Sequence, residues 1–203
     1  MKKIRVYSDF TCPFCFLGKK TMEDAVNISD IEWMPFELRP EGTDPIDPNS
    51  SYIQEGWTQS VQPLAARLGI QMTLPALNPH PRTTLAHEGY QYAKAHHKGY
   101  EYVQQVFAAF WQEGRDIGCI EVLGDIATEV GLNKEDFEAA LQARTYREAH
   151  VQALREATHI RAVPTMEIEG NLLQGLQHPE RIKRVLEKTT DMTTGDSCSI
   201  EGC

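Results

Sequence analysis

The chain has 203 residues, of which 41% are hydrophobic and 24% charged, as is usual for a globular protein, and this composition excludes a disordered or fibrous one. Acidic residues outnumber basic ones 29 to 20, which gives a net charge of −9, so we expect no nucleic acid partner. The chain lacks the ~18 consecutive apolar residues of a membrane helix and shows no signal-peptide core after Met1. We therefore expect a cytoplasmic protein without a membrane partner.

The first predicted unit is a β-α-β arrangement over residues 3–39. A short alternating run at residues 4–7 predicts a strand. A helix is expected to begin after Cys12, because Pro13 suits the first turn, where its missing N–H costs nothing. The apolar and aromatic residues 31–38 predict a second strand.

The middle of the chain, residues 41–160, is predicted to be almost entirely helical. Apolar side chains recur at helical spacing over residues 100–111 and again over residues 123–130. An earlier helix is expected at residues 51–68. Prolines within residues 75–81 mark a linker between that helix and the later ones.

The last structured region is predicted to return to strands. Residues 164–168 and 172–174 flank Gly170-Asn171 and predict a hairpin, and a helix follows from Pro179. The simplest arrangement joins both strand regions in one sheet. We therefore predict an α/β fold of three parts: a discontinuous domain that contains the sheet (1–43 and 161–189), an inserted helical domain (44–160) and a flexible tail (190–203).

The stretch Cys12-Pro13-Phe14-Cys15 carries the clearest chemical signal. A helix N-terminus presents unpaired N–H groups and partial positive charge, which favour the thiolate of Cys12. Cys12 would attack a disulfide or thiol, and Cys15 would resolve the mixed disulfide. The alternative is half of a zinc site, which needs a second pair of ligands. The other close pair is Cys198 and Cys203, in the tail. Redox chemistry is favoured and no metal is predicted, because a CxxC motif between a strand and a helix fits a thioredoxin-like redox motif.

Val163-Pro164 supplies a second, independent signal. A proline at the start of a strand lacks the N–H that the ladder needs, so its position calls for a reason. A cis Val163–Pro164 bond would bend the chain beside the dithiol and leave backbone groups of Val163 free to pair with an extended substrate. An ordinary edge proline is the alternative, and the CxxC motif favours the cis bond.

The run at residues 8–15 (SDFTCPFC), the strand end at residues 36–40 (FELRP) and Val163-Pro164 together resemble the DsbA family, most closely its FrnE-like branch. The resemblance spans about residues 3–188. It implies a thioredoxin fold with a large inserted helical domain, and thiol-disulfide oxidoreductase activity.

Family roles carry over to Cys12 as the nucleophile, Cys15 as the resolving thiol and Pro164 as the cis-proline. The candidate substrate-binding residues are Pro13, Phe14, Val163 and Pro164. No bound cofactor is expected because the cysteines carry the electrons, although glutathione is a candidate co-substrate. The expected partners are protein or small-molecule thiols and disulfides, and a reductant or oxidant that recycles the dithiol.

Two features depart from the best-known relatives and keep alternatives open. Periplasmic DsbA enzymes have a histidine where this chain has Phe14, which predicts a less oxidising disulfide here. Glutathione-dependent isomerases of the 2-hydroxychromene-2-carboxylate type also resemble the chain, but they have a serine in place of Cys12. A third hypothesis is a non-enzymatic redox or metal sensor, in which Cys198 and Cys203 form a second redox pair.

Several other residues are given structural roles. We expect Cys119 to be a buried small hydrophobe and His87 a packing histidine rather than a ligand-binding one. For Asp9 and Glu37, capping and surface roles are favoured over proton transfer near the dithiol. Three aromatic residues are assigned to the core: Phe107, Phe110 and Trp111.

Overall fold

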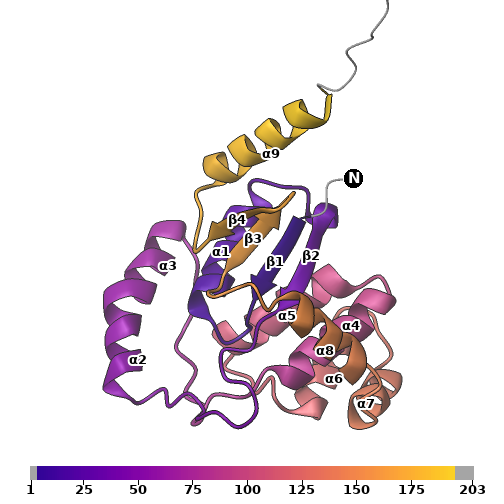
Figure 1. Cartoon of the computed structure of the whole chain (residues 1–203). Coiled ribbons are helices and arrows are strands. Elements are labelled where there is room, and N and C mark those ends of the chain that lie inside the picture. Colours follow the sequence, from indigo (N-terminus) through magenta and orange to yellow (C-terminus); the bar gives the residue numbers. More distant parts are fainter. Residues whose placement is uncertain (1–3, 195–203) are drawn as a thin grey trace, which may run out of the picture.

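The computed structural model describes residues 4–194, and its centre is a mixed sheet with the strand order β2-β1-β3-β4. β1 (Ile4–Ser8) pairs in parallel with β2 (Ile31–Pro35) and antiparallel with β3 (Thr165–Ile168), which pairs antiparallel with β4 (Asn171–Gln174). Both ends of the chain therefore build one sheet (Figure 1), which confirms the predicted thioredoxin-like arrangement.

β2 is shorter than predicted, since it ends at Pro35 rather than at Leu38. Past that point the backbone N–H of Phe36 still donates to Ser8 O, at 3.0 Å. The N–H of Leu38 instead donates to the side chain of Asp9, at 2.6 Å. β2 does not extend to Leu38 because the N–H of Leu38 donates to a side chain rather than to the backbone of β1.

The hairpin between β3 and β4 turns one residue earlier than predicted. Its two turn residues are Glu169 and Gly170, with φ of 48° and 79°, and Ile168 pairs with Asn171 across the turn. A two-residue turn with positive φ at both positions matches the twist of the flanking strands. Only Gly170 adopts this conformation without steric cost.

Two helices of the thioredoxin-like part lie against each other: α1 (Pro13–Glu23) and α9 (Pro179–Thr194). α9 begins at the predicted proline but continues to Thr194, so residues 190–194 are helical and the predicted flexible tail began too early. Cys198 and Cys203 lie outside the described residues.

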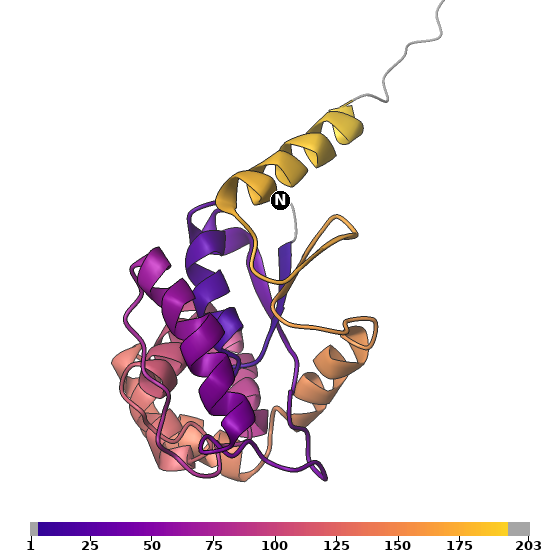
Figure 2. The same cartoon turned by 90° about the vertical axis from the view of Figure 1, so that its left-hand side faces the viewer.

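The inserted region has two separate parts. One is an arm beside the sheet, made of α2 (Ser51–Gly56), a π-helical segment (Trp57–Val61) and α3 (Gln62–Leu68). The other is a bundle that lies mostly beyond β2 in Figure 1, whereas the arm lies beyond β4, and the two parts meet where Trp57 of the arm stacks on Trp111 of the bundle (Figures 1 and 2). The helices of the bundle are α4 (Thr84–Ala95), α5 (Gly99–Trp111), α6 (Ile120–Glu129), α7 (Lys134–Gln142) and α8 (Arg147–Glu156).

The main core joins the bundle to the sheet and to α1. The ring of Phe107 lies 5.0 Å from that of Phe10 and 6.2 Å from that of Trp33 on β2. Phe107, Phe110 and Trp111 are all buried, which confirms their assignment to the core. No helix within residues 4–194 is both long and apolar enough to cross a bilayer.

The prediction for Cys119 was wrong, because this side chain is exposed. Cys119 has extended backbone geometry and caps the N-terminus of α6, so it lies outside the helical face that packs inward. The apolar residue two positions earlier, Ile117, is the one that is fully buried.

Candidate active site

The first functional side chain is placed by the start of α1. Cys12 is the N-cap, with φ −86° and ψ 115°, and Pro13 occupies the first helical turn, as predicted. The carbonyl of Cys12 accepts hydrogen bonds from the N–H groups of Cys15 (3.1 Å) and Phe16 (3.3 Å). The Cys12 thiol therefore lies at the end of the helix where unpaired N–H groups favour negative charge.

The two thiols differ in their access to solvent. Cys12 is 4% exposed and Cys15 is fully buried, one helical turn further in, and both are free thiols. Burial, followed by the hydrogen bond and charge of Cys12, raises the pKa of Cys15 well above its ordinary value, although the backbone of Asp9 opposes this shift. Cys15 is therefore protonated at neutral pH, and it needs a proton acceptor before it can act as a nucleophile.

Val163 and Pro164 lie directly beside this dithiol. The peptide bond between them is cis, and the Cys12 thiol donates to Val163 O at 3.8 Å. Pro164 packs against α1 at Gly18, where a Cβ atom would lie only 3.3 Å from Pro164 Cγ. The sequence pattern places Gly18 on the buried face of this helix but does not pair it with Pro164, although a glycine inside a helix costs about 1 kcal/mol relative to alanine and so signals a packing requirement.

A cavity of about 630 Å³ opens next to Cys12. Three of the four predicted substrate-binding residues, namely Pro13, Phe14 and Val163, line it together with Cys12. Phe14 is 36% exposed, which is high for so large an apolar side chain. Pro164 does not line this cavity, because it faces the other way, toward Gly18 of α1.

Behind Cys15 the surroundings are polar. Asp9 is 1% exposed and accepts hydrogen bonds from the N–H and hydroxyl of Thr11, both at 2.9 Å, and from the N–H of Leu38. Burial is the largest influence on Asp9 and raises its pKa, although these hydrogen bonds and one from Thr83 oppose the rise. The predicted capping and surface roles are both wrong, because the N-cap of α1 is Cys12 without a side-chain cap, and Asp9 is a buried carboxyl bound to the turn before the helix.

A second buried polar group follows at the end of β2. His150 Nε2 lies 2.8 Å from Glu37 Oε1, and the hydroxyl of Thr84 also hydrogen-bonds to Glu37. Burial acts to raise the pKa of Glu37, but these two hydrogen bonds outweigh it and hold the pKa below its ordinary value. Glu37 therefore ties the sheet to α8 rather than facing solvent.

His87 is a packing histidine, as predicted. Its ring stacks on His150 at 5.6 Å and lies 4.8 Å from the ring of Phe10. Burial lowers its pKa to about 3, so it is neutral at physiological pH.

Within the described part of the chain, no three or more His, Cys, Asp or Glu side chains gather in a way that could hold a metal ion.

Sequence reasoning did not single out Thr83, Thr84 and His150. The motif Phe36-Glu37-Leu38 pointed to one end of their network, but its partners lie far along the chain.

Comparison with known proteins agrees with this geometry. The uncharacterized protein YwbO of Bacillus subtilis (strain 168) is 46% identical over 178 residues, which cover 85% of this chain and 89% of YwbO. The probable DsbA oxidoreductase SCO1869 from Streptomyces coelicolor superposes with a TM-score of 0.80 at 20% identity, over 100% of this chain and 98% of that one. The cytosolic disulfide reductase DsbM from Pseudomonas aeruginosa gives 0.70 at 18%, over 94% and 99%. These two structures share the fold, and since the family described as DSBA-like thioredoxin domain matches residues 3–187, the chain belongs to that family.

Proposed function

We propose that the protein is a thiol-disulfide oxidoreductase in which Cys12 is the nucleophile and Cys15 the resolving thiol. The observation that carries this proposal is the unequal placement of the two thiols. Cys12 lines a cavity at the N-terminus of α1, whereas Cys15 is fully buried one turn behind it. A substrate can meet the first thiol and not the second.

The reaction proceeds in two exchange steps. The Cys12 thiolate attacks one sulfur of a substrate disulfide, forms a mixed disulfide and expels the other half of the substrate as a thiolate. Cys15 then loses its proton and attacks Cys12 Sγ, which releases the second substrate thiolate and leaves a Cys12–Cys15 disulfide. The substrate gains two electrons, and an external thiol restores the dithiol.

The proton of Cys15 needs an acceptor at the buried end of the site. Asp9 is the carboxyl best placed to accept this proton, since it is buried beside Cys15 and its charge acts on the Cys15 thiol. A carboxyl whose pKa is raised by burial is a better base than an exposed one. We assign Asp9 as the group that receives this proton.

The preferred direction is reduction of substrate disulfides, with glutathione as the small thiol that recycles the dithiol in the cytoplasm. Phe14 supports this direction, because the position between the cysteines carries no side chain that could donate to the Cys12 thiolate and make the disulfide strongly oxidising. The similarity to a protein described as a cytosolic disulfide reductase also supports it. Membership of the FrnE-like branch stays a prediction, as does any exchange with Cys198 and Cys203.

The test is reduction of insulin disulfides driven by dithiothreitol, in which the intact protein is compared with Cys12→Ala. We expect catalysed turnover to disappear in the variant, because the attacking thiol is gone. Cys119→Ser is the matched control, since it removes an exposed thiol that does not line the cavity beside Cys12 and should leave turnover unchanged. If neither the intact protein nor the control accelerates the reaction, the proposal fails and the glutathione-dependent isomerase becomes the better hypothesis.

A further inference from the structure

The cavity beside Cys12 is bounded by aromatic rings. Trp57, from the π-helical segment of the arm, lies parallel to Trp111 of α5, with ring centres 6.1 Å apart and planes within 3°. Tyr52 and Phe14 line the same space and are both exposed. A volume of about 630 Å³ falls in the range of roughly 300–1,000 Å³ that small-molecule sites occupy.

The charge of this cavity differs from that of the whole molecule. The chain carries a net charge of −9, yet no carboxylate is among the residues that line this cavity in the described structure. Arg39 is the lining residue that carries positive charge. The other basic lining residue, His80, is neutral at pH 7, because burial lowers its pKa below 6.5 although the Pro75 carbonyl opposes this effect.

Arg39 is available to a ligand. Within residues 4–194 its guanidinium makes no ion pair, and it donates only a long hydrogen bond of 3.3 Å to Leu38 O. The loop that carries it is held by Arg82, which donates to the carbonyls of Arg39 (2.8 Å), Pro40 (2.6 Å) and Thr43 (2.6 Å). A free cation on a fixed loop is preorganised for an anion.

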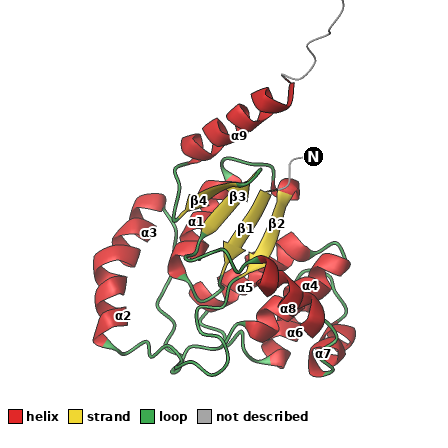
Figure 3. Ribbon diagram, in the orientation of Figure 1, coloured by secondary structure: helices red, strands yellow, loops and turns green. Residues whose placement is uncertain are grey.

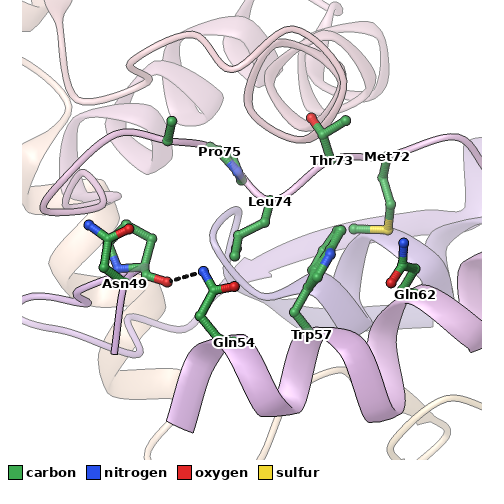
Figure 4. A pocket seen from close by; sticks show the side chains of 10 residues that line it. Asn49, Gln54, Trp57, Gln62, Met72, Thr73, Leu74 and Pro75 are labelled. Carbon is green, nitrogen blue, oxygen red and sulfur yellow. Dashed lines mark hydrogen bonds between the residues drawn. The ribbon is translucent and has the colours of Figure 1, made fainter. Parts of the chain in front are cut away.

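A second cavity, of about 400 Å³, is lined in part by Trp57 and Leu74 (Figure 4). Both residues also line the cavity beside Cys12, so the two cavities adjoin there. Figure 4 shows amide side chains around this second space, among them Gln54, which donates to Pro48 O at 2.8 Å.

We propose that the cavity beside Cys12 is a site for small disulfides whose halves carry an aromatic body and one carboxylate, and this proposal rests on the thiol-disulfide exchange proposed above. The aromatic body packs against Trp57 and Trp111, the carboxylate meets Arg39, and one sulfur lies at Cys12. The reaction is balanced: the dithiol and one disulfide give the Cys12–Cys15 disulfide and two small thiols.

The test uses four disulfides that vary the two features independently. Dithiobis(nitrobenzoate) is aromatic and anionic, dithiodipyridine aromatic and neutral, dithiodipropionate aliphatic and anionic, and bis(hydroxyethyl) disulfide aliphatic and neutral. The protein carries Cys119→Ser, Cys198→Ser and Cys203→Ser, so that only the dithiol reacts. Loss of the dithiol is followed by rapid alkylation and mass spectrometry, and each rate is divided by the rate of the same disulfide with free glutathione.

We expect the normalised rate for dithiobis(nitrobenzoate) to exceed that for bis(hydroxyethyl) disulfide by about tenfold, as stacking on buried aromatic rings predicts.

Arg39→Gln should lower the rates of the two anionic disulfides by about threefold, the size typical of an exposed charge pair, and leave the rates of the two neutral disulfides unchanged. Arg67→Gln is the control, because it removes an exposed positive charge from α3 without touching the cavity. Trp57→Phe should retain the aromatic preference, and Trp57→Ala should lose it.

Two outcomes would overturn the proposal while leaving the exchange activity in place. One is four equal normalised rates, and the other is an Arg39→Gln effect that is the same for neutral and anionic disulfides. If none of the four disulfides oxidises the dithiol, the proposed function itself is wrong.

Discussion

On the Cys12 side of the dithiol lies a cavity walled by aromatic rings, whereas on the Cys15 side lie the buried carboxyl of Asp9 and, further on, the pair of Glu37 and His150. The difference separates two tasks that disulfide exchange requires. Substrate must reach one thiol, and a proton must leave the other. Each side of α1 is built for one of these tasks.

The two sides also come from different parts of the chain. The aromatic side is formed by the α2–α3 arm, by Trp111 of the bundle and by loops that run below the sheet between arm and bundle (Figure 3). The polar side is formed by the ends of β1 and β2 with α4 and α8. Substrate preference can therefore change through the arm without disturbing the proton acceptor.

Among the variants, Asp9→Asn should have the largest effect, and this effect should fall on the step of Cys15 rather than on that of Cys12. With dithiobis(nitrobenzoate), stopped-flow absorbance resolves release of the first thiol, by Cys12, from release of the second, by Cys15. We expect the second phase to slow by about 100-fold, because an amide cannot accept the Cys15 proton, and the first phase to change little.

The pH dependence of the second phase follows from the same group. The pKa of Asp9 is raised above 3.8 by burial, so the second phase should accelerate as the pH rises through this elevated value and the carboxyl ionises. Asp9→Asn should lose this acid limb. Thr11→Val keeps the carboxyl and removes one of its hydrogen bonds, so it should retain the limb. An acid limb that survives in Asp9→Asn would exclude Asp9 as the acceptor.

Glu37→Gln tests whether the outer part of the polar side is structural. Loss of the charged hydrogen bond to His150 should lower the free energy of unfolding by about 1–2 kcal/mol at pH 7, as urea denaturation would measure. Because the pKa of Glu37 is held below 4.5 in the folded state, its contribution is full above 4.5 and is lost as the pH falls through the folded value. The difference from the intact protein should therefore shrink in acid.

The matched control for Glu37→Gln is Glu101→Gln, which breaks an exposed pair with Lys98 and should change the stability by less than about 0.5 kcal/mol. An equal loss in both variants, or a loss that grows in acid, would contradict the role given to Glu37.

Gly18→Ala should have the smallest effect, because two contributions oppose each other. Alanine improves helix propensity by about 1 kcal/mol, but its methyl group would press on Pro164 at 3.3 Å. We expect nearly unchanged stability by urea denaturation and insulin turnover that falls about twofold, since the chain beside Cys12 must shift.

Gly56→Ala measures the propensity gain alone, because its methyl group meets nothing within 4 Å. If Gly18→Ala stabilises the protein as much as Gly56→Ala does and keeps full turnover, the close contact between Gly18 and Pro164 is not required for stability or for insulin reduction.

Much of the fold could be predicted from local sequence patterns. The proline after Cys12 marks the start of α1, and alternation and turn residues mark the strands and the hairpin. The capping of α7 by Asn133 is another local feature, since its side chain accepts from Asp136 N, three residues later, at 2.8 Å. These features depend on residues close together in the sequence.

The features that sequence reasoning missed depend on residues far apart. Glu37 and His150 are separated by most of the inserted region, so no local pattern could pair them. The local sequence did not predict the cis bond before Pro79, nor the π-helical segment that carries Trp57. The prediction for Cys119 failed because apolar neighbours were taken to indicate burial, although Cys119 is the N-cap of α6 and lies before the helical face that packs inward.

The pairing of β1 with both β2 and β3 has a consequence for the synthesis of the protein. A ribosome releases β1, α1 and β2 early, but β3 and the segment before it emerge only after the whole insertion. During that interval one edge of β1 is bare, and the two thiols have left the ribosome without Val163 and Pro164 beside them. An unpaired strand edge next to reactive thiols favours aggregation and the formation of non-native disulfides. The nascent chain is therefore most vulnerable before its own active site is complete.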